Sequence, residues 1–369
     1  MGKQTVYLLV EPAQAKPVWF LCMEDSLRQS CRKKRLTLRT VDDPGQLDRL
    51  AEKPVSVLVI CSQNNWTRHT VNELQRRHIM PVLLGVLPSL FGDSVSGIIM
   101  ARRVLIGKVM DYFVSCGRRR MALVGVNRNA GNDNVKTEAF LQISREMGLP
   151  ATEEDVYPID PDILNCVTAC LSRAERYDGV ICSNDYVAAV LLAQAAARGI
   201  AVPGDLYVIG LGDTMIGRYT QPTLTTTTYD EYFEMGRQAV NIWQIFSENP
   251  SLNSIIISVS TEIIPRGSTA FSQPRSKLPP LPDTPPPDIT IGNANQVMHN
   301  LENCLRNCDD LDIRILRAIL SGLSIEQIES SLFLAHSSLH YRLRRIYQLA
   351  NVERRSELEQ LFRYYLPNF

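Results

Sequence analysis

Short apolar runs alternate with amphipathic stretches over the first 266 residues. Helical patterns fall at residues 18–35, 43–53 and 70–78, and apolar runs fall at 5–10, 36–41, 55–61 and 81–85. Strands that alternate with helices form parallel sheets covered by helices on both faces. The run at 55–61 contains almost no polar position, which is typical of a central strand. The pattern therefore predicts an α/β fold.

The same alternation starts again near residue 103. Helical patterns at 103–116, 135–147, 163–175 and 185–198 alternate with strand patterns at 120–125, 156–159, 178–182 and 207–211. A helix at 229–246 and a strand at 254–264 complete this part of the chain. We expect a two-lobed sensor over residues 1–267, with lobe 1 at about 1–97 and 229–250 and lobe 2 at about 98–228 and 254–266. Ligands bind beyond the carboxyl ends of parallel strands, so the lobes predict a ligand cleft between them.

A proline-rich segment at residues 268–292 follows the predicted sensor. Residues 272–288 contain seven prolines in 17 positions. Such a composition is typical of a semi-rigid spacer in a polyproline-like conformation. The spacer leads into an all-α domain at residues 293–369, which opens with an amphipathic helix at 293–308.

Residues 311–361 have the pattern of two short helices across a tight turn, followed by a further helix. Gly322 stands where a helix ends, and Ser324 with Gln327 forms a capping box for the next helix. The helix predicted at 336–349 carries a polar face, and no acidic residue occurs between 333 and 352. That face comprises Ser337, Ser338, His340, Tyr341, Arg344 and Arg345. A cationic helix braced across a turn suits the major groove of double-stranded DNA, although a solvated helix in a small bundle has the same pattern.

Composition indicates the cellular compartment of the protein and limits how it could contact DNA. The 369 residues carry a formal net charge of zero, so any contact with DNA must come from a local cationic face. The nine cysteines form no paired framework and no metal-ligand set, which indicates reduced thiols and a cytoplasmic protein. We expect no signal peptide, because residues 5–10 already read as a strand, and no membrane span.

No catalytic motif accompanies this organisation. Gly210 and Gly212 lack the third glycine of a dinucleotide-binding loop, and neither a phosphate-binding P-loop, an H-E-x-x-H helix nor a nucleophile elbow occurs. We therefore expect that the protein is not an enzyme and that it needs no cofactor.

The sensor region resembles a known family. Residues 177–188, 199–213, 219–226 and 117–125 resemble the sensor domain of LacI/GalR-type repressors, which has the type I periplasmic-binding-protein fold. The resemblance implies that the position of Asp185 binds a ligand hydroxyl. It also places Asn134 where the family has a sugar-binding arginine, six residues before an aromatic, here Phe140.

The tail resembles a second family. Residues 316–322, 323–328, 346–352 and 355–358 are similar to the LuxR/GerE-type helix-turn-helix. In that family the last helix is often a dimer contact, which here would use Leu358, Leu361, Phe362 and Tyr365. LacI-type proteins carry their DNA-binding module at the N-terminus, and Met1 leaves no room for it, so we expect that the output lies at the other end.

Further candidate ligand contacts follow strands. Asn184 and Asp185 place an amide and a carboxylate directly after a strand, although either residue also serves as an ordinary helix cap. Asp213, after Gly210 and Gly212, is a weaker candidate. Trp19, Phe20 and Trp66 follow the first and third strands, where they would stack on a sugar or base ring or simply pack.

Two functional hypotheses follow from these patterns. The first is a cytoplasmic, homodimeric transcription regulator, in which a small polar effector such as a sugar or nucleoside controls DNA binding by the C-terminal helix-turn-helix. The second is a metabolite-binding or protein-interaction adaptor whose helical tail has no affinity for DNA. Salt dependence separates them, because only a DNA binder loses affinity steeply as salt rises. A solute-binding transport component is a third alternative, disfavoured by the expected lack of a signal peptide.

Overall fold

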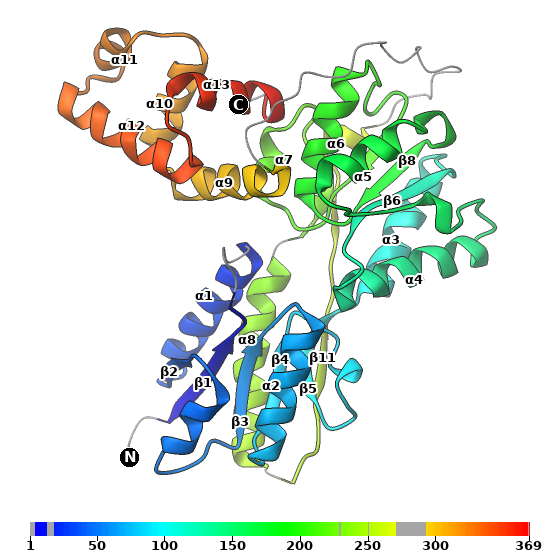
Figure 1. Ribbon diagram of the computed structural model, residues 1–369, viewed down its shortest axis with the longest axis vertical. Helices are drawn as coiled ribbons and strands as arrows, with labels where there is room; N and C mark the ends of the chain where they lie inside the picture. Colours follow the sequence, from blue (N-terminus) through cyan, green and yellow to red (C-terminus); the bar gives the residue numbers. More distant parts are fainter. Residues whose placement is uncertain (1–3, 13–17, 229, 250, 271–292, 368) are drawn as a thin grey trace. The chain divides into compact units, whose positions relative to one another are not determined.

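The computed structural model of the protein divides into two compact units (Figure 1). It describes all residues except 1–3, 13–17, 229, 250, 271–292 and 368. Unit 1 comprises Met1–Lys108, Asn127–Phe140 and Thr228–Glu262, and unit 2 comprises Val109–Val126, Leu141–Thr227 and Ile263–Phe369. The predicted proline spacer lies almost entirely outside the described residues. Within the described part of the chain, no helix is long and apolar enough to cross a membrane.

Unit 1 is built on a six-stranded sheet in the order β11-β5-β4-β3-β1-β2, and every adjacent pair of strands is parallel. The strands are β1 (Thr5–Val10), β2 (Thr37–Val41), β3 (Ser56–Ile60), β4 (Met80–Leu84), β5 (Ser96–Met100) and β11 (Ile256–Val259). All five residues of β3 are buried, which confirms the prediction of a central strand.

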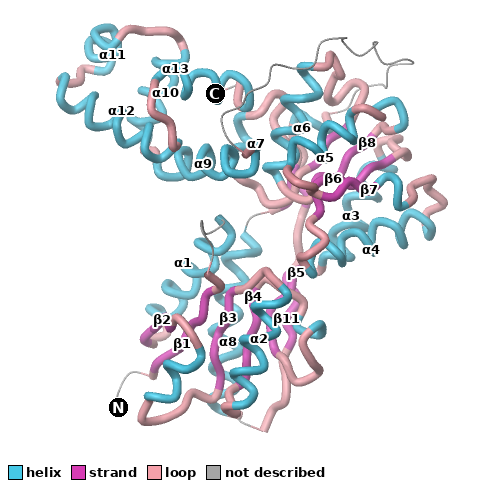
Figure 2. The backbone as a smooth tube through the Cα atoms, in the orientation of Figure 1, coloured by secondary structure: helices cyan, strands magenta, loops and turns pink. Residues whose placement is uncertain are grey.

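Helices cover both faces of this sheet, as Figure 2 shows. Leu8 belongs to an apolar cluster with α1 (Val18–Lys33) and α8 (Asp230–Glu248), whereas the next residue, Leu9, belongs to a cluster with α2 (Asn64–Arg76). Successive side chains of a strand point to opposite faces, so an apolar strand fills both cores. The predicted doubly covered α/β architecture is confirmed for this unit.

Unit 2 contains a four-stranded parallel sheet in the order β7-β6-β8-β9. Its strands are β6 (Met121–Val126), β7 (Val156–Pro158), β8 (Gly179–Cys182) and β9 (Tyr207–Ile209). The helices α5 (Ile163–Leu171) and α6 (Asp185–Ala197) share an apolar cluster with alternate residues of these strands. A short antiparallel pair, β10 (Thr226–Thr227) with β12 (Ile263–Ile264), also belongs to unit 2. From here on, lobe 2 means this α/β part of unit 2 as the structure shows it, in place of the residue range predicted from the sequence.

Two helices cross the division between the units. These are α3 (Arg102–Ser115) and α4 (Gly131–Glu146). In unit 2, the Phe113 ring of α3 lies so close to Gly179 that a Cβ there would collide with it. Gly179 thus admits the tight packing of α3 against β8.

The C-terminal helices also belong to unit 2. They are α9 (Ala294–Asn307), α10 (Asp310–Leu320), α11 (Ile325–Leu332), α12 (His336–Ala350) and α13 (Arg355–Tyr365). The helix α9 packs against α7 (Met215–Tyr219), α6 and α5, and α13 packs against α6. A single apolar cluster runs through lobe 2 and these helices. The C-terminal domain is therefore packed on lobe 2, and the sequence did not indicate this.

The structure differs from the sequence-based prediction at three elements. The expected helix at 43–53 is a short 3-10 helix, Pro44–Arg49, because Pro44 and Gly45 follow the capping side chain of Asp43. The strand β5 has no counterpart among the strands predicted from the sequence. The expected strand at 254–264 is two strands, β11 in unit 1 and β12 in unit 2, so its assignment to lobe 2 alone is wrong. A single apolar pattern runs through both strands. It does not reveal that the first part pairs with β5 and the second part with β10.

Candidate effector site and nucleic-acid interface

The residues Asn184 and Asp185 stand where β8 ends and α6 begins. The Asn184 side-chain oxygen accepts hydrogen bonds from the backbone N–H groups of Tyr186 and Val187, both at 3.0 Å. Asparagine is a preferred N-cap because its side chain satisfies amides that have no partner in the first turn. Asn184 is thus a helix cap, the structural alternative that the sequence leaves open.

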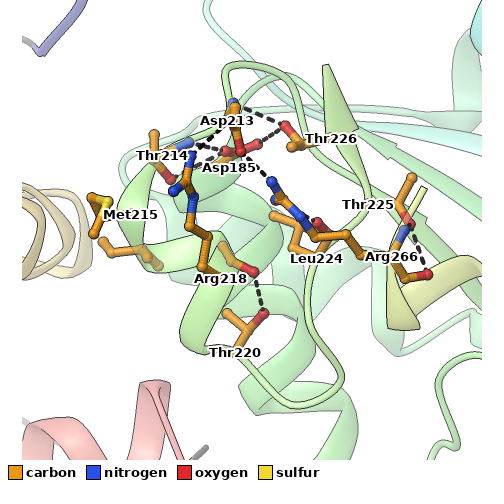
Figure 3. Close-up of polar contacts among 12 residues, drawn as sticks. Asp185, Asp213, Thr214, Met215, Arg218, Thr220, Leu224, Thr225, Thr226 and Arg266 are labelled. Atoms are coloured by element: carbon orange, nitrogen blue, oxygen red, sulfur yellow. Dashed lines mark hydrogen bonds and ion pairs between the residues drawn. The ribbon is translucent and has the colours of Figure 1, made fainter. Parts of the chain in front are cut away.

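The Asp185 carboxylate is completely buried, and both of its oxygens have partners inside the chain (Figure 3). One oxygen, Oδ2, accepts from the backbone N–H of Thr214 at 2.7 Å and from its hydroxyl at 3.1 Å. The other, Oδ1, accepts from the Thr226 hydroxyl at 2.6 Å. Burial raises the pKa of Asp185 to about 6, and the hydrogen bonds oppose this shift. A ligand hydroxyl would compete with the threonine donors for this carboxylate.

The Asp213 carboxylate lies between two guanidinium groups in the same region (Figure 3). Arg218 contacts Oδ2 at 3.1 Å, and Arg266 pairs with Oδ1. Arg266 also donates to the Leu224 carbonyl at 3.0 Å, and the Asp213 backbone N–H donates to the Thr226 hydroxyl at 3.1 Å. Asp185 and Asp213 thus belong to one polar network, which we call the Asp185 site.

Four members of the Asp185 site are absent from the sequence-based candidates. They are Thr214, Arg218, Thr226 and Arg266. Two of them have a sequence signal: Thr214 follows Asp213 directly, and Thr226 lies in the 219–226 stretch of the LacI/GalR resemblance. Arg266 comes to the site through the antiparallel pairing of β10 with β12, which no spacing in the sequence reveals.

The aromatic candidates in unit 1 do not form one stacking site. Phe20 is only 1% exposed and belongs to the core, which is the packing alternative that the sequence leaves open. Trp19 stacks on the protein's own Tyr232, with ring centroids 6.0 Å apart. Trp66 packs against the apolar cluster on the opposite face of the sheet. Apolar packing accounts for all three rings.

Asn134 lies on α4 with an exposed side chain. The neighbouring Lys136 is buried and pairs with Asp133 at 2.7 Å, and burial lowers the pKa of Lys136. The cation near Asn134 is therefore already neutralised within its own helix.

Two of the predicted tail helices, α11 and α12, are present and follow each other across a short turn. The Ser324 hydroxyl accepts from the Gln327 backbone N–H at 3.3 Å, and the Gln327 side-chain oxygen accepts from the Ser324 N–H at 2.8 Å. In α12, Leu339, Leu343 and Ile346 are buried. The opposite side of α12 carries exposed side chains, as predicted, and we call them the α12 face: Ser337, Ser338, His340, Tyr341 and Arg344.

Arg345, which is predicted as a DNA contact together with the α12 face, is engaged within the chain, so we do not include it in the α12 face. Its guanidinium contacts the buried Asp312 of α10 at 2.6 Å and donates to the Asn307 carbonyl at 2.6 Å. Arg342 pairs with Asp312 at 2.7 Å and with Asp309 at 2.9 Å. Residues 333–352 contain no acid, so the sequence suggests that these arginines are unpaired. Their carboxylate partners come instead from α10 and from the residue that precedes it. Arg345 holds α12 to α10.

The apolar face of α13 is also covered within the chain. Its members Leu358, Leu361, Phe362 and Tyr365 are at most 6% exposed, and α13 packs against α10, α12 and α6. The prediction that this face is a dimer contact is therefore wrong. Burial against lobe 2 and the neighbouring helices accounts for its hydrophobicity.

Phe333 is a further candidate that the sequence-based prediction omits. It ends α11 in the left-handed backbone conformation, with φ of 54°, and its side chain is 94% exposed. An exposed aromatic ring and a left-handed non-glycine residue are each unfavourable for the fold, and such combinations occur at functional sites. Phe333 stands at the turn that precedes α12.

Comparison with known proteins identifies part of this architecture. Residues 110–269 match the family model described as a periplasmic binding protein-like domain. The regulator GalS of Salmonella typhimurium is 32% identical over 140 residues, which cover 37% of this chain and 39% of that protein. The repressor PurR of Haemophilus influenzae is 25% identical over 251 residues, which cover 65% of this chain and 72% of that protein. The chain thus aligns with only about two fifths of GalS.

Solved structures show the same fold. The regulator CelR in complex with cellobiose has a TM-score of 0.60 at 16% identity, covering 72% of this chain and 85% of that one. A LacI-family regulator from Enterococcus faecium with bound ribose has a TM-score of 0.59 at 18% identity, covering 73% and 99%. The α/β part of the chain therefore has the periplasmic-binding-protein-like fold found in LacI-family transcriptional regulators.

Proposed function

We propose that the protein is a transcription regulator that binds double-stranded DNA through α12, under the control of a small polar effector bound by its α/β sensor. The observation that carries this proposal is the α12 face, which is exposed on a helix braced by a capped α11. The resemblance of the tail to LuxR/GerE-type helix-turn-helix modules supports it, as do the transcriptional regulators among the relatives of the sensor.

Within the α12 face, Arg344 is the principal cation. Among the described residues it has no ion-pair partner, in contrast to Arg342 and Arg345. A guanidinium without a competing carboxylate holds a guanine edge or a phosphate. Ser337 and Ser338, in the first turn of α12, add hydroxyls that suit phosphate or base contacts.

Phe333 and Tyr341 give this surface an aromatic component. Tyr341 is 72% exposed, and Phe333 is 94% exposed. Apolar rings in the major groove contact thymine methyl groups, and a tyrosine hydroxyl also reaches phosphate. We infer that both rings lie against DNA in the complex, which would account for their exposure here.

The effector is inferred to be a hydroxyl-rich small molecule, such as a sugar or nucleoside. Relatives in this fold are named for complexes with cellobiose and with ribose. Asp185 already accepts two hydroxyl hydrogen bonds, from Thr214 and Thr226, which is the chemistry that a sugar hydroxyl offers.

We also infer a homodimer, because a single helix-turn-helix buries little surface and such modules bind as pairs on two-fold sites. Since the apolar face of α13 is covered within the chain, we infer that the dimer contact uses another surface.

The test is selection of bound duplexes from a random-sequence library by the full chain, followed by affinity measurements on the enriched sequence. We expect enrichment of a two-fold symmetric site, and an Arg344→Ala variant should lose at least about tenfold in affinity. Arg314→Ala, an exposed cation on α10, is the matched control and should bind nearly as the parent does. Equal binding by both variants, or no enrichment at all, would contradict the proposal and favour the adaptor.

A further inference from the structure

Glu302 of α9 is a buried carboxylate that reaches out of the C-terminal domain into lobe 2. It is 0% exposed, and its two oxygens accept from the backbone N–H groups of Met215 at 3.0 Å and Ile216 at 2.9 Å. Arg306, one turn further along α9, contacts it at 3.0 Å. Hydrogen bonds from amides to a carboxylate are stronger than neutral ones, and a buried carboxylate depends on keeping them.

The same short segment also holds Asp185. Thr214 donates its backbone N–H to Asp185, and the next two N–H groups, of Met215 and Ile216, go to Glu302. Three consecutive amides at the start of α7 are therefore shared between a carboxylate of the Asp185 site and one of the C-terminal domain. A shift of this segment toward one carboxylate must alter its bonds to the other.

The contacts continue from Glu302 to the proposed DNA-binding helix. In α9, Asn303 donates to the Leu349 carbonyl at 3.4 Å, and the Cys304 thiol contacts the Ile346 carbonyl at 3.9 Å. Both carbonyls belong to the C-terminal half of α12. Figure 1 shows α9 lying between α7 and α12 within unit 2.

Lobe 2 and the C-terminal domain also share neutral and aromatic contacts. Gln194 of α6 donates to the Tyr364 hydroxyl at 2.5 Å, and the Tyr219 and Phe369 rings lie 4.7 Å apart. The two hydrogen bonds accepted by Glu302 join a charged group of the C-terminal domain to the segment that holds Asp185.

We propose that the start of α7 is a switch that couples the Asp185 site to the docking of the C-terminal domain on lobe 2, with Glu302 as its latch. An effector hydroxyl that replaces Thr214 on Asp185 displaces this segment, weakens its bonds to Glu302 and so changes how α9 holds α12. The effect on DNA binding through α12 rests on the proposed function. The hydrogen bonds between Glu302 and the start of α7 do not depend on it.

Hydrogen–deuterium exchange of the full chain tests the latch. Glu302→Gln keeps the size of the side chain but turns an NH2 group toward an N–H donor, so we expect the Met215 and Ile216 amides to exchange at least about tenfold faster. Glu353→Gln, the same change at an exposed position, should leave them unchanged. Unaltered protection in the Glu302→Gln variant would overturn the latch.

If Glu302→Gln fails to fold, Met215→Pro provides the second variant. Proline is accepted at the first position of a helix, and Thr214 already has the extended backbone that precedes proline, with φ of −70° and ψ of 159°. The change removes one donor and keeps the charge. Faster exchange of Ile216 and of α9 is expected, and parental rates would overturn the latch.

Asp185→Ala tests the coupling, because Asp185 makes no hydrogen bond to the C-terminal domain among those of the described residues. We expect faster exchange in α9 as well as at Thr214, with Asp185→Asn restoring protection, since an asparagine accepts from Thr214 and donates to Thr226. Changes confined to lobe 2 would overturn the coupling.

Affinity for the selected duplex separates this proposal from the proposed function. If the parent chain binds DNA, Glu302→Gln should shift its affinity at least about threefold relative to Glu353→Gln; lost protection in α9 with unchanged affinity would overturn the regulatory role. If the parent binds no DNA, the proposed function fails, while the exchange results still decide the latch.

Discussion

The Asp185 site and the α12 face differ in where their polar atoms find partners. The sequence predicts both as binding surfaces, because each gathers polar residues on or beside a helix. At the Asp185 site, each carboxylate is fully engaged by threonines or arginines of the same chain. On the α12 face, Arg344 and the first-turn serines project into solvent. The former arrangement stabilises the fold, and the latter is available to a partner.

The difference shows how a polar residue should be interpreted in this molecule. Asp185, Arg345 and Glu302 all join elements that are distant in the sequence. A buried charge with several partners is costly to disturb, whereas an exposed one is cheap to change. Substitutions at the Asp185 site should therefore act first on stability, and those on the α12 face first on DNA binding.

The largest effect on stability is expected from Asp185→Ala. It leaves the Thr214 N–H and two threonine hydroxyls without their acceptor in a buried site, so the free energy of unfolding should fall by about 3 kcal/mol. Asp185→Asn, which keeps an acceptor and adds a donor, should cost much less. Denaturant titration measures both variants, and equal losses would show that the hydrogen bonds are not the cause.

Next in size is a dependence of stability on pH. The pKa of Asp185 is raised to about 6 in the folded protein, so between pH ~4 and ~6 the folded state binds more protons than the unfolded state. The contribution of this group to stability is therefore greatest below pH ~4 and is lost as pH rises to ~6. Unfolding measured across this range should show a smaller decrease for Asp185→Asn than for the parent; parallel curves would refute the assignment.

A smaller loss of stability distinguishes the two neighbouring arginines of α12. Arg345→Ala removes one of two guanidinium partners of the buried Asp312, so unfolding should become easier by about 1–2 kcal/mol. Arg344→Ala should change the free energy of unfolding by less than about 0.5 kcal/mol. Thermal unfolding of the two variants side by side checks this, and the reverse order would return Arg345 to the α12 face.

The last expected change is a gain in stability. Phe333→Asn replaces an exposed ring by a residue that tolerates the left-handed conformation, so stability should rise by up to about 1 kcal/mol. Affinity for the selected duplex should nevertheless fall. If both stability and DNA affinity fall, Phe333 has a structural role that its 94% exposure does not reveal.

The sequence predicts local structure well where the signal is local. The alternation of strands and helices, the capping box of Ser324 and Gln327 and the buried stripe of α12 are all confirmed. Partners supplied by distant segments are not predicted, as Arg266 beside Asp213 and Asp312 beside Arg345 show. For the same reason the apolar face of α13 suggests a dimer contact, because an amphipathic helix does not specify which surface covers it.

The salt dependence of DNA binding tests the central claim most directly. The full chain is titrated onto the selected duplex at a series of salt concentrations, with Arg344→Ala and Arg314→Ala in parallel. We predict that the logarithm of the affinity falls linearly with the logarithm of salt, and that Arg344→Ala reduces either the slope, by about one, or the preference for the selected sequence. Affinity that is absent, independent of salt or unaltered by the loss of Arg344 would contradict the assignment of α12 as the DNA-binding helix.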